Sequence, residues 1–302
     1  MNRRVFFGSG VGAVAISWGL LTGSGWGQEA TLTAPQTSAA RSQVANKTTG
    51  QRVFFCGHSF HQFVAKPVAL LAREAGLTDH TIAGEQYLGG SRPLWHWNLP
   101  DEKNKLKAAL ATGKVDVVTL SPHVEIPDAG IDNYANLAFE YNPQVRVMLQ
   151  LSWAPRDWQL TPGFKNEDRD AVTRSDLDDR LRKTGREYFE RMKAQAVALN
   201  TKHGREFVQI VPCGEAVLRL REAVVDGNVP GVKRQSELFR DPLGHAQQPL
   251  QDLVAYCWFA AIYGRNPEGM KALVKPGDDV SQRQQRLLQQ IAWSTISDES
   301  AK

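Results

Sequence analysis

A serine that follows a short strand-like run could act as a nucleophile. Ser59 lies in the segment Gly57-His58-Ser59-Phe60-His61, directly after the strand candidate 52–56. A glycine two residues before the serine permits a sharp turn, which would expose the hydroxyl and leave the Ser59 amide free to stabilise an oxyanion. A serine at a strand-to-helix junction also commonly caps the helix that follows. On this segment alone, capping is the favoured interpretation.

An aspartate and a histidine near the other end of the chain could activate such a serine. Asp241 and His245 lie in the polar, turn-rich segment 239–245. An aspartate can orient an imidazole and stabilise its cation, so that the histidine takes a proton from a serine. Taken alone, the pair could also be an ordinary turn residue and a cap.

Alternating β-type runs and helical stretches must position these side chains. Short apolar runs predict strands at residues 52–56, 81–88, 115–120, 145–151 and 207–211. The spacing of apolar residues predicts helices at about 68–75, 101–112, 175–200 and 250–263. The alternation predicts an α/β fold, a three-layer α/β/α sandwich around a mostly parallel, five-stranded sheet of flavodoxin-like type.

The ends of the predicted strands indicate where chemistry should lie, because ligands of an open parallel sheet bind beyond the carboxyl ends of its strands. The residues at these ends are Ser59, Gly89-Gly90, Ser121 with His123, Trp153 and 212–214. The tryptophans could form a wall that stacks on a sugar, although core packing explains most of them equally well. The charged segment 156–180 is typical of a lid or a solvated excursion.

The order of these motifs resembles that of the SGNH (GDSL-like) hydrolases, in particular a bacterial branch whose first block reads Gly-Asn-Ser-Phe or Gly-His-Ser-Phe. Gly57 to Phe60 resembles that first block, Gly89-Gly90 the second, and the Asp241/His245 pair the last. Residues 241–267 also look like the closing helix of that branch. The resemblance covers about residues 51–270, interrupted by an insertion at about 154–180.

This resemblance implies a role for each matching residue. Ser59 would be the nucleophile, His245 the general base and Asp241 the partner that orients it. The reaction would be hydrolysis of an acyl ester through an acyl-enzyme, without a cofactor. The implied substrates are esters of small molecules or carbohydrates, acetyl esters included.

The resemblance also implies an oxyanion hole. Its donors would be the backbone amide of Ser59 and that of Gly89 or Gly90. Many members add an asparagine after the third strand, where this chain reads Leu120-Ser121-Pro122-His123. Ser121 or His123 could donate in its place.

Two other functions stay open at the level of the sequence. Without that asparagine, the chain could be a non-catalytic or weakly active SGNH-fold binding protein. Alternatively, histidines 58, 61, 123 and 245 could converge on a metal and serve a metal-dependent hydrolase. No His-x-x-x-His spacing or flanking carboxylate supports the metal site, so we expect none.

The first 50 residues predict an export signal and a tether. Arg3-Arg4 precedes an apolar stretch to about residue 21 and then small residues, an order typical of a secretory signal over 1–30. The paired arginines favour the twin-arginine route, although a general secretory signal looks similar. A membrane anchor is the alternative, but the run is short and rich in glycine. Residues 31–50 predict a flexible linker, and residues 51–302 are then the hydrolase domain. The export signal predicts that the protein is periplasmic or secreted.

Charge and cysteine content narrow the function further. The formal net charge is +4 and no dense Lys/Arg stripe occurs, so a nucleic-acid partner is not expected. We expect no stable membrane span once the signal is cleaved. The three cysteines lie in apolar stretches and are odd in number, which favours buried thiols over a disulfide framework.

Overall fold

The structure is a computed structural model that describes residues 49–159, 162–275 and 277–300. The predicted export signal and nearly all of the predicted linker lie outside these residues.

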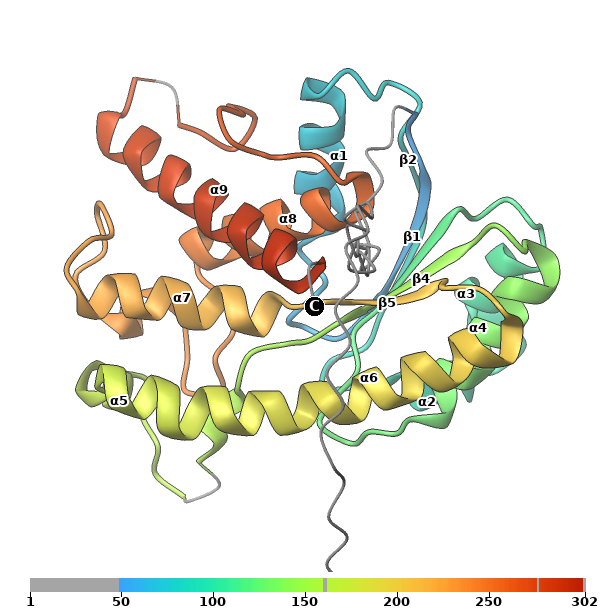
Figure 1. The fold of residues 1–302 in the computed structure, drawn as a ribbon, viewed down its shortest axis with the longest axis horizontal. Helices are drawn as coiled ribbons and strands as arrows, with labels where there is room; N and C mark the ends of the chain where they lie inside the picture. Colours follow the sequence, from blue (N-terminus) through green and yellow to red (C-terminus); the bar gives the residue numbers. More distant parts are fainter. Residues whose placement is uncertain (1–48, 160–161, 276, 301–302) are drawn as a thin grey trace, which may run out of the picture. The chain divides into compact units, whose positions relative to one another are not determined.

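Five parallel strands form one sheet in the order β2-β1-β3-β4-β5 (Figure 1). They are β1 (Arg52–Gly57), β2 (Thr81–Tyr87), β3 (Val117–Leu120), β4 (Arg146–Gln150) and β5 (Val208–Val211). This is the flavodoxin-like order, which places the topological switch point between β1 and β3. The predicted five-stranded sheet is confirmed, and its strands begin and end within two residues of the expected positions.

Helices cover both faces of the sheet, because successive side chains of each strand point to opposite faces. Val53 and Phe55 of β1 face one hydrophobic core, while Phe54 and Cys56 face the other. The first core is covered by α1 (Ala65–Glu74), α7 (Cys213–Val225), α8 (Gln248–Tyr263) and α9 (Asp279–Ser300). The second is covered by α3 (Lys105–Leu110), α4 (Ala129–Tyr141) and α6 (Lys183–His203). The predicted three-layer α/β/α sandwich is confirmed.

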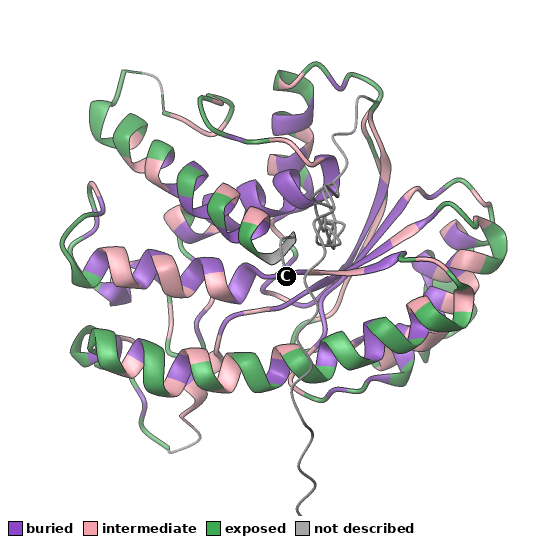
Figure 2. Cartoon of the chain, viewed as in Figure 1, coloured by how far each residue is buried: buried purple, intermediate pink, exposed green. Residues whose placement is uncertain are grey.

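Helix α8 is buried almost all round, as its continuous apolar sequence predicts (Figure 2). It lies between the sheet and the polar helix α9, which the sequence analysis did not predict. The three cysteines are buried free thiols, as expected.

Two predicted helices differ in detail. The helix expected at 101–112 is divided into a 3-10 turn (Asp101–Lys103) and α3, because Asn104 caps α3 by accepting a hydrogen bond from the Lys107 amide. The helix expected at 175–200 is α6, preceded by α5 (Arg174–Asp176) and a π-helical segment (Leu177–Arg182). The short helix α2 (Pro93–Trp97) follows the Gly89-Gly90 turn.

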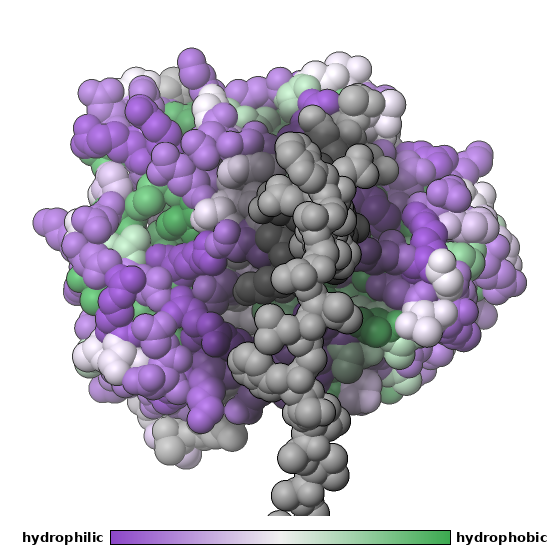
Figure 3. Space-filling view, in the orientation of Figure 1, coloured by the Kyte–Doolittle hydropathy of each residue, from purple (hydrophilic) through white to green (hydrophobic). Residues whose placement is uncertain are grey.

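The outer surface is mostly polar on the face shown in Figure 3, where apolar side chains form small, separate groups outside the grey atoms. No helix of the described residues is long and apolar enough to cross a membrane. The segment between β4 and α6, expected to be a lid or a solvated excursion, is in part tightly packed, since Asp157, Phe164, Arg169 and Val172 are buried.

Candidate active site

The turn that follows β1 holds Ser59 at the carboxyl edge of the sheet. Gly57 is required there by space: a Cβ at this position would lie 2.6 Å from the Ser121 Cβ and 3.1 Å from the His61 Cβ. Ser59 does not cap a helix, because α1 begins only at Ala65 and its N-cap is Val64. The capping alternative is therefore wrong, and the hydroxyl faces a cavity.

Ser59, His245 and Asp241 form one chain of hydrogen bonds. The His245 Nε2 lies 2.9 Å from the Ser59 Oγ, and its Nδ1 lies 2.6 Å from the Asp241 Oδ2. Because the carboxylate accepts the Nδ1 proton, Nε2 is the unprotonated nitrogen of the neutral ring, and in that form it accepts from the serine hydroxyl. A histidine in this tautomer is set up to take the serine proton.

The Asp241–His245 turn fixes the aspartate as well as the histidine. The Asp241 Oδ1 accepts hydrogen bonds from the backbone amides of Gly244 at 3.0 Å and His245 at 3.2 Å. Burial by itself raises the pKa of Asp241, but these bonds and that from the His245 ring outweigh it and lower the pKa below its ordinary value. Gly244 has a φ of 103°, which lets the turn absorb the four-residue spacing of the pair.

A small cavity of ≈ 50 Å³ adjoins the Ser59 hydroxyl. Its lining comprises His58, Ser59, Phe60, Gly90, Pro122, His123, Val124, Ser152, Trp153, Pro155, Trp158, Tyr188 and Leu243. Within the described part of the chain, no acceptor is bonded to the backbone amides of Ser59, Gly89 or Gly90. Of the two glycines, only Gly90 is among the lining residues, so its amide is the better placed to share an oxyanion with Ser59.

The two candidate replacements for the asparagine take different positions. Ser121 is buried beneath the turn, where its Oγ lies 2.9 Å from the His58 Nε2. His58 also accepts a hydrogen bond from the Phe60 amide, and burial lowers its pKa to about 3, so it is a neutral support of the turn. His123 instead lines the cavity. Burial, and then the charge of Arg92, lower the pKa of His123, which favours its neutral ring.

A buried glutamine that the sequence analysis did not single out holds the Ser59 turn to the sheet. Gln150, at the end of β4, donates to the Phe60 carbonyl at 3.0 Å and accepts from the His61 Nδ1 at 2.9 Å and the Trp258 Nε1 at 2.8 Å. Thr119 satisfies the other nitrogen of His61 at 2.7 Å. The signal was present, since a glutamine in an otherwise apolar strand needs buried partners.

The four histidines proposed for a metal site do not form one among the described residues, although the His58 and His123 rings lie 6.2 Å apart. His61 has both ring nitrogens hydrogen-bonded to Gln150 and Thr119, and His245 has both bonded to Asp241 and Ser59. His58 is engaged beneath the turn. Across the residues that the structure describes, no group of three or more His, Cys, Asp or Glu residues could hold a metal ion. The geometry therefore favours the serine site.

Comparisons with known proteins bear on the fold. No family model and no curated protein matches the chain. Among solved structures, a DUF4886 family protein from Bacteroides uniformis superposes with a TM-score of 0.55 and 17% identity, over 82% of this chain and 95% of that one. The chain has the fold of that protein.

Two further structures match less closely. A protein from Slackia heliotrinireducens, provisionally described as an SGNH hydrolase, has a TM-score of 0.42 and 15% identity over 72% of this chain and 100% of its own. An extracellular lipase from Streptomyces rimosus has a TM-score of 0.32 and 12% identity, over 54% of this chain and 81% of its own. The TM-scores of these two structures are below 0.5, so neither supports a conclusion about this chain, and an activity must be argued from the site.

Proposed function

We propose that the chain is a serine esterase with Ser59 as nucleophile, His245 as general base and Asp241 as the residue that orients it. One observation carries the proposal: the His245 ring bridges the Asp241 carboxylate and the Ser59 hydroxyl at 2.6 and 2.9 Å. Ser59 and His245 are 186 positions apart in the sequence, and the fold brings them into hydrogen-bond contact. A serine needs such a base to attack an ester at neutral pH.

The reaction follows from this geometry. The Ser59 Oγ attacks the ester carbonyl carbon while its proton passes to the His245 Nε2, and Asp241 stabilises the resulting imidazolium. The amides of Ser59 and Gly90, with the His123 ring, would stabilise the negative charge that develops on the carbonyl oxygen by donating hydrogen bonds to it. His245 then protonates the leaving alcohol, and the same base activates the water that releases the acid and restores the serine hydroxyl.

The cavity favours a short acyl group. Its ≈ 50 Å³ accommodates a group on the order of a few water molecules, such as an acetyl group. Trp158, which is partly exposed, contributes aromatic surface to its wall, and this suits a carbohydrate as the alcohol part of the ester, whereas Trp153 is buried and stacked on Phe60. We therefore propose short-chain acyl esters, carbohydrate acetyl esters included, as the substrate class.

Steady-state hydrolysis of p-nitrophenyl acetate, followed by an acetylated sugar, tests the proposal. Ser59→Ala and His245→Ala should each lose about 10⁴-fold or more in kcat, with the fold retained by circular dichroism. Hydrolysis that persists in Ser59→Ala and is abolished by a chelator would show that the activity depends on a metal and not on Ser59. A folded protein that hydrolyses neither ester would support the alternative of a non-catalytic binding protein with this fold.

We further propose that the chain is exported through its first 30 residues. The support is their charged, apolar and then small-residue order. Replacement of Arg3-Arg4 by two lysines should trap the unprocessed chain inside the cell, as seen by fractionation and intact mass. Normal export of that variant would favour the general secretory route.

A further inference from the structure

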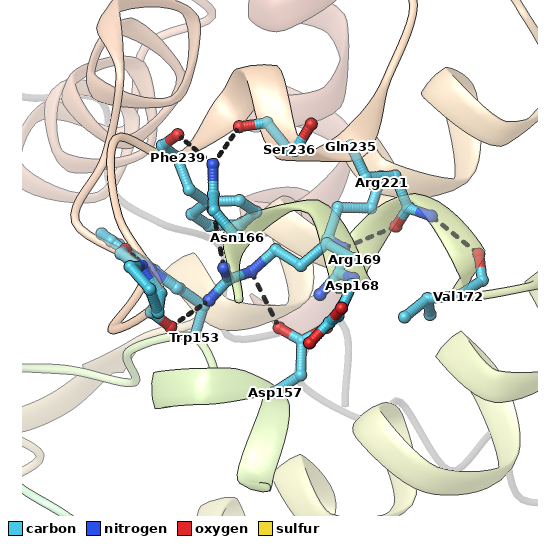
Figure 4. A network of polar contacts seen from close by, with 12 residues as sticks. Trp153, Asp157, Asn166, Asp168, Arg169, Val172, Arg221, Gln235, Ser236 and Phe239 are labelled. Atoms are coloured by element: carbon cyan, nitrogen blue, oxygen red, sulfur yellow. Dashed lines mark hydrogen bonds and ion pairs between the residues drawn. The ribbon is translucent and has the colours of Figure 1, made fainter. Parts of the chain in front are cut away.

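A buried polar network is built largely by the segment between β4 and α6 (Figure 4). Arg169 connects this network to the Asp241–His245 turn. At the centre of the network, the Asp157 carboxylate is paired with two guanidinium groups. The Arg169 Nε lies 3.2 Å from the Asp157 Oδ1, and the Arg221 Nη2 lies 2.7 Å from the Oδ2. All three side chains are at most 2% exposed. Such a cluster is costly to bury unless its remaining donors are satisfied.

The remaining donors of Arg169 are directed at the turn that carries the aspartate. Its Nη2 donates to the Pro242 carbonyl at 2.8 Å, and its Nη1 to the Asp241 carbonyl at 3.3 Å. Nη1 also donates to the Asn166 Oδ1 at 2.7 Å. The Phe239 ring, 4.5 Å from the guanidinium carbon, adds a cation–π contact that fixes its plane.

The next two carbonyls of the turn are held by the same segment. The Trp153 Nε1 donates to the Gly244 carbonyl at 2.8 Å, and the Arg156 amide donates to the Leu243 carbonyl at 3.0 Å. Every backbone carbonyl from residue 241 to residue 244 therefore accepts a hydrogen bond from residues 153–169. Since His245 follows directly, its backbone can shift relative to Ser59 only if these bonds break, while the ring itself is held by Asp241.

The backbone that supplies these donors adopts an unfavourable conformation. Arg156, Asp157 and Trp158 have φ angles of 50°, 52° and 60° in succession. Left-handed residues other than glycine persist only where their surroundings demand them, and they concentrate at functional sites. Here the turn presents the Arg156 amide to Leu243 and the Asp157 carboxylate to Arg169.

We propose that Arg169 is a positioning residue for the esterase site, which locks the Asp241–His245 turn so that the histidine stays within reach of the serine. Its effect on catalysis rests on the proposed function. On this account, Trp153, Arg156 and Arg169 form a fixed brace of the site rather than part of a lid. Arg169 touches no reacting atom and acts through the turn.

Arg221 provides a matched control. It is buried, pairs with the same Asp157 carboxylate and donates to the Gln235 Oε1 at 2.7 Å, yet it makes no hydrogen bond to the turn among the described residues. Loss of either arginine removes one of the two partners of the buried Asp157 carboxylate and should lower the melting temperature. Only loss of Arg169 also frees the carbonyls of Asp241 and Pro242.

The experiment compares the full chain with its Arg169→Met, Arg169→Lys and Arg221→Met variants. Arg169→Met should lower kcat about a hundredfold with KM nearly unchanged, because a displacement of about 1 Å in a catalytic group costs that much. Arg169→Lys, which keeps one charged donor, should recover part of the loss and serves if Arg169→Met does not fold. Arg221→Met should have a lower melting temperature, but its kcat should fall by less than threefold.

Hydrogen exchange followed by mass spectrometry supplies a readout that needs no turnover. The amides of Gly244 and His245 should exchange faster in both Arg169 variants than in Arg221→Met and the unaltered chain. Equal exchange and equal kcat in Arg169→Lys and Arg221→Met, or a kcat loss that only follows the melting temperature, would overturn the inference. An unaltered chain without Ser59-dependent hydrolysis would refute the proposed function instead, and the exchange data would still decide whether Arg169 holds the turn.

Discussion

Replacement of Gln150 by leucine should uncouple the Ser59 turn from the sheet. Gln150 is fully buried, and its loss would strand three buried groups: the His61 Nδ1–H, the Trp258 Nε1–H and the Phe60 carbonyl. An unsatisfied buried polar group costs on the order of 1–3 kcal/mol, so a little over 1 kcal/mol for each predicts a loss of about 4 kcal/mol in the free energy of unfolding. Because the Phe60 carbonyl adjoins Ser59, serine reactivity should fall as well.

Urea unfolding followed by tryptophan fluorescence measures this loss. Gln209→Leu is the matched control, since Gln209 lies on the neighbouring strand β5, is only half-buried and makes no side-chain hydrogen bond within the described residues. It should change the free energy of unfolding by less than about 0.5 kcal/mol. If the two variants differ by less than about 1 kcal/mol, the proposed support of the turn by Gln150 is refuted.

Three further predictions follow from the same region. Burial lowers the pKa of His61 to about 4 and of His58 to about 3, so the unfolded chain binds more protons below about pH 6.5 and stability is lost as the pH falls from there. Each should contribute a loss of about 2 kcal/mol by pH 5, and His61→Gln should reduce the fall of the urea midpoint between pH 7 and 5; a midpoint independent of pH would contradict this. Gly57→Ala should lower the rate at which a fluorophosphonate labels Ser59 at least tenfold, because the added Cβ would lie 2.6 Å from the Ser121 Cβ. Gly185→Ala, whose Cβ would meet nothing within 4 Å, should leave this rate unchanged. In an ester series, kcat/KM should be highest for acetyl and fall about tenfold or more by hexanoyl, because the cavity holds ≈ 50 Å³; a preference for long chains would count against this cavity as the acyl site.

The sheet could be predicted because short β-branched and apolar runs separated by helical stretches have few alternatives. Helix α8 was equally clear from its continuous apolar sequence. Helices α4, α7 and α9 were not predicted. Helix α9 is polar along most of its length and buries only a narrow stripe against α8, including Leu288 and Ala292, so its role depends on a neighbour distant in sequence.

The grouping of Ser59, Asp241 and His245 could be predicted only through the resemblance of their motifs to those of the SGNH hydrolases, since the predicted topology placed Ser59 at the carboxyl edge of the sheet but not the Asp241/His245 pair. The supports of these residues could not. Arg169 stands in a charged segment that is typical of a solvated excursion, and only the fold brings it to the carbonyls of residues 241 and 242. Likewise, the sequence offered Ser121 and His123 as equivalent donors, and the packing of Ser121 against His58 separates them.

The most direct test of the central claim is covalent labelling with a fluorophosphonate followed by intact mass and peptide mapping. The account predicts one adduct per chain, located on Ser59, with labelling abolished in Ser59→Ala and strongly slowed in a folded His245→Ala variant. A folded chain that takes up no label, or an adduct on another serine, would contradict the assignment of Ser59 as the nucleophile.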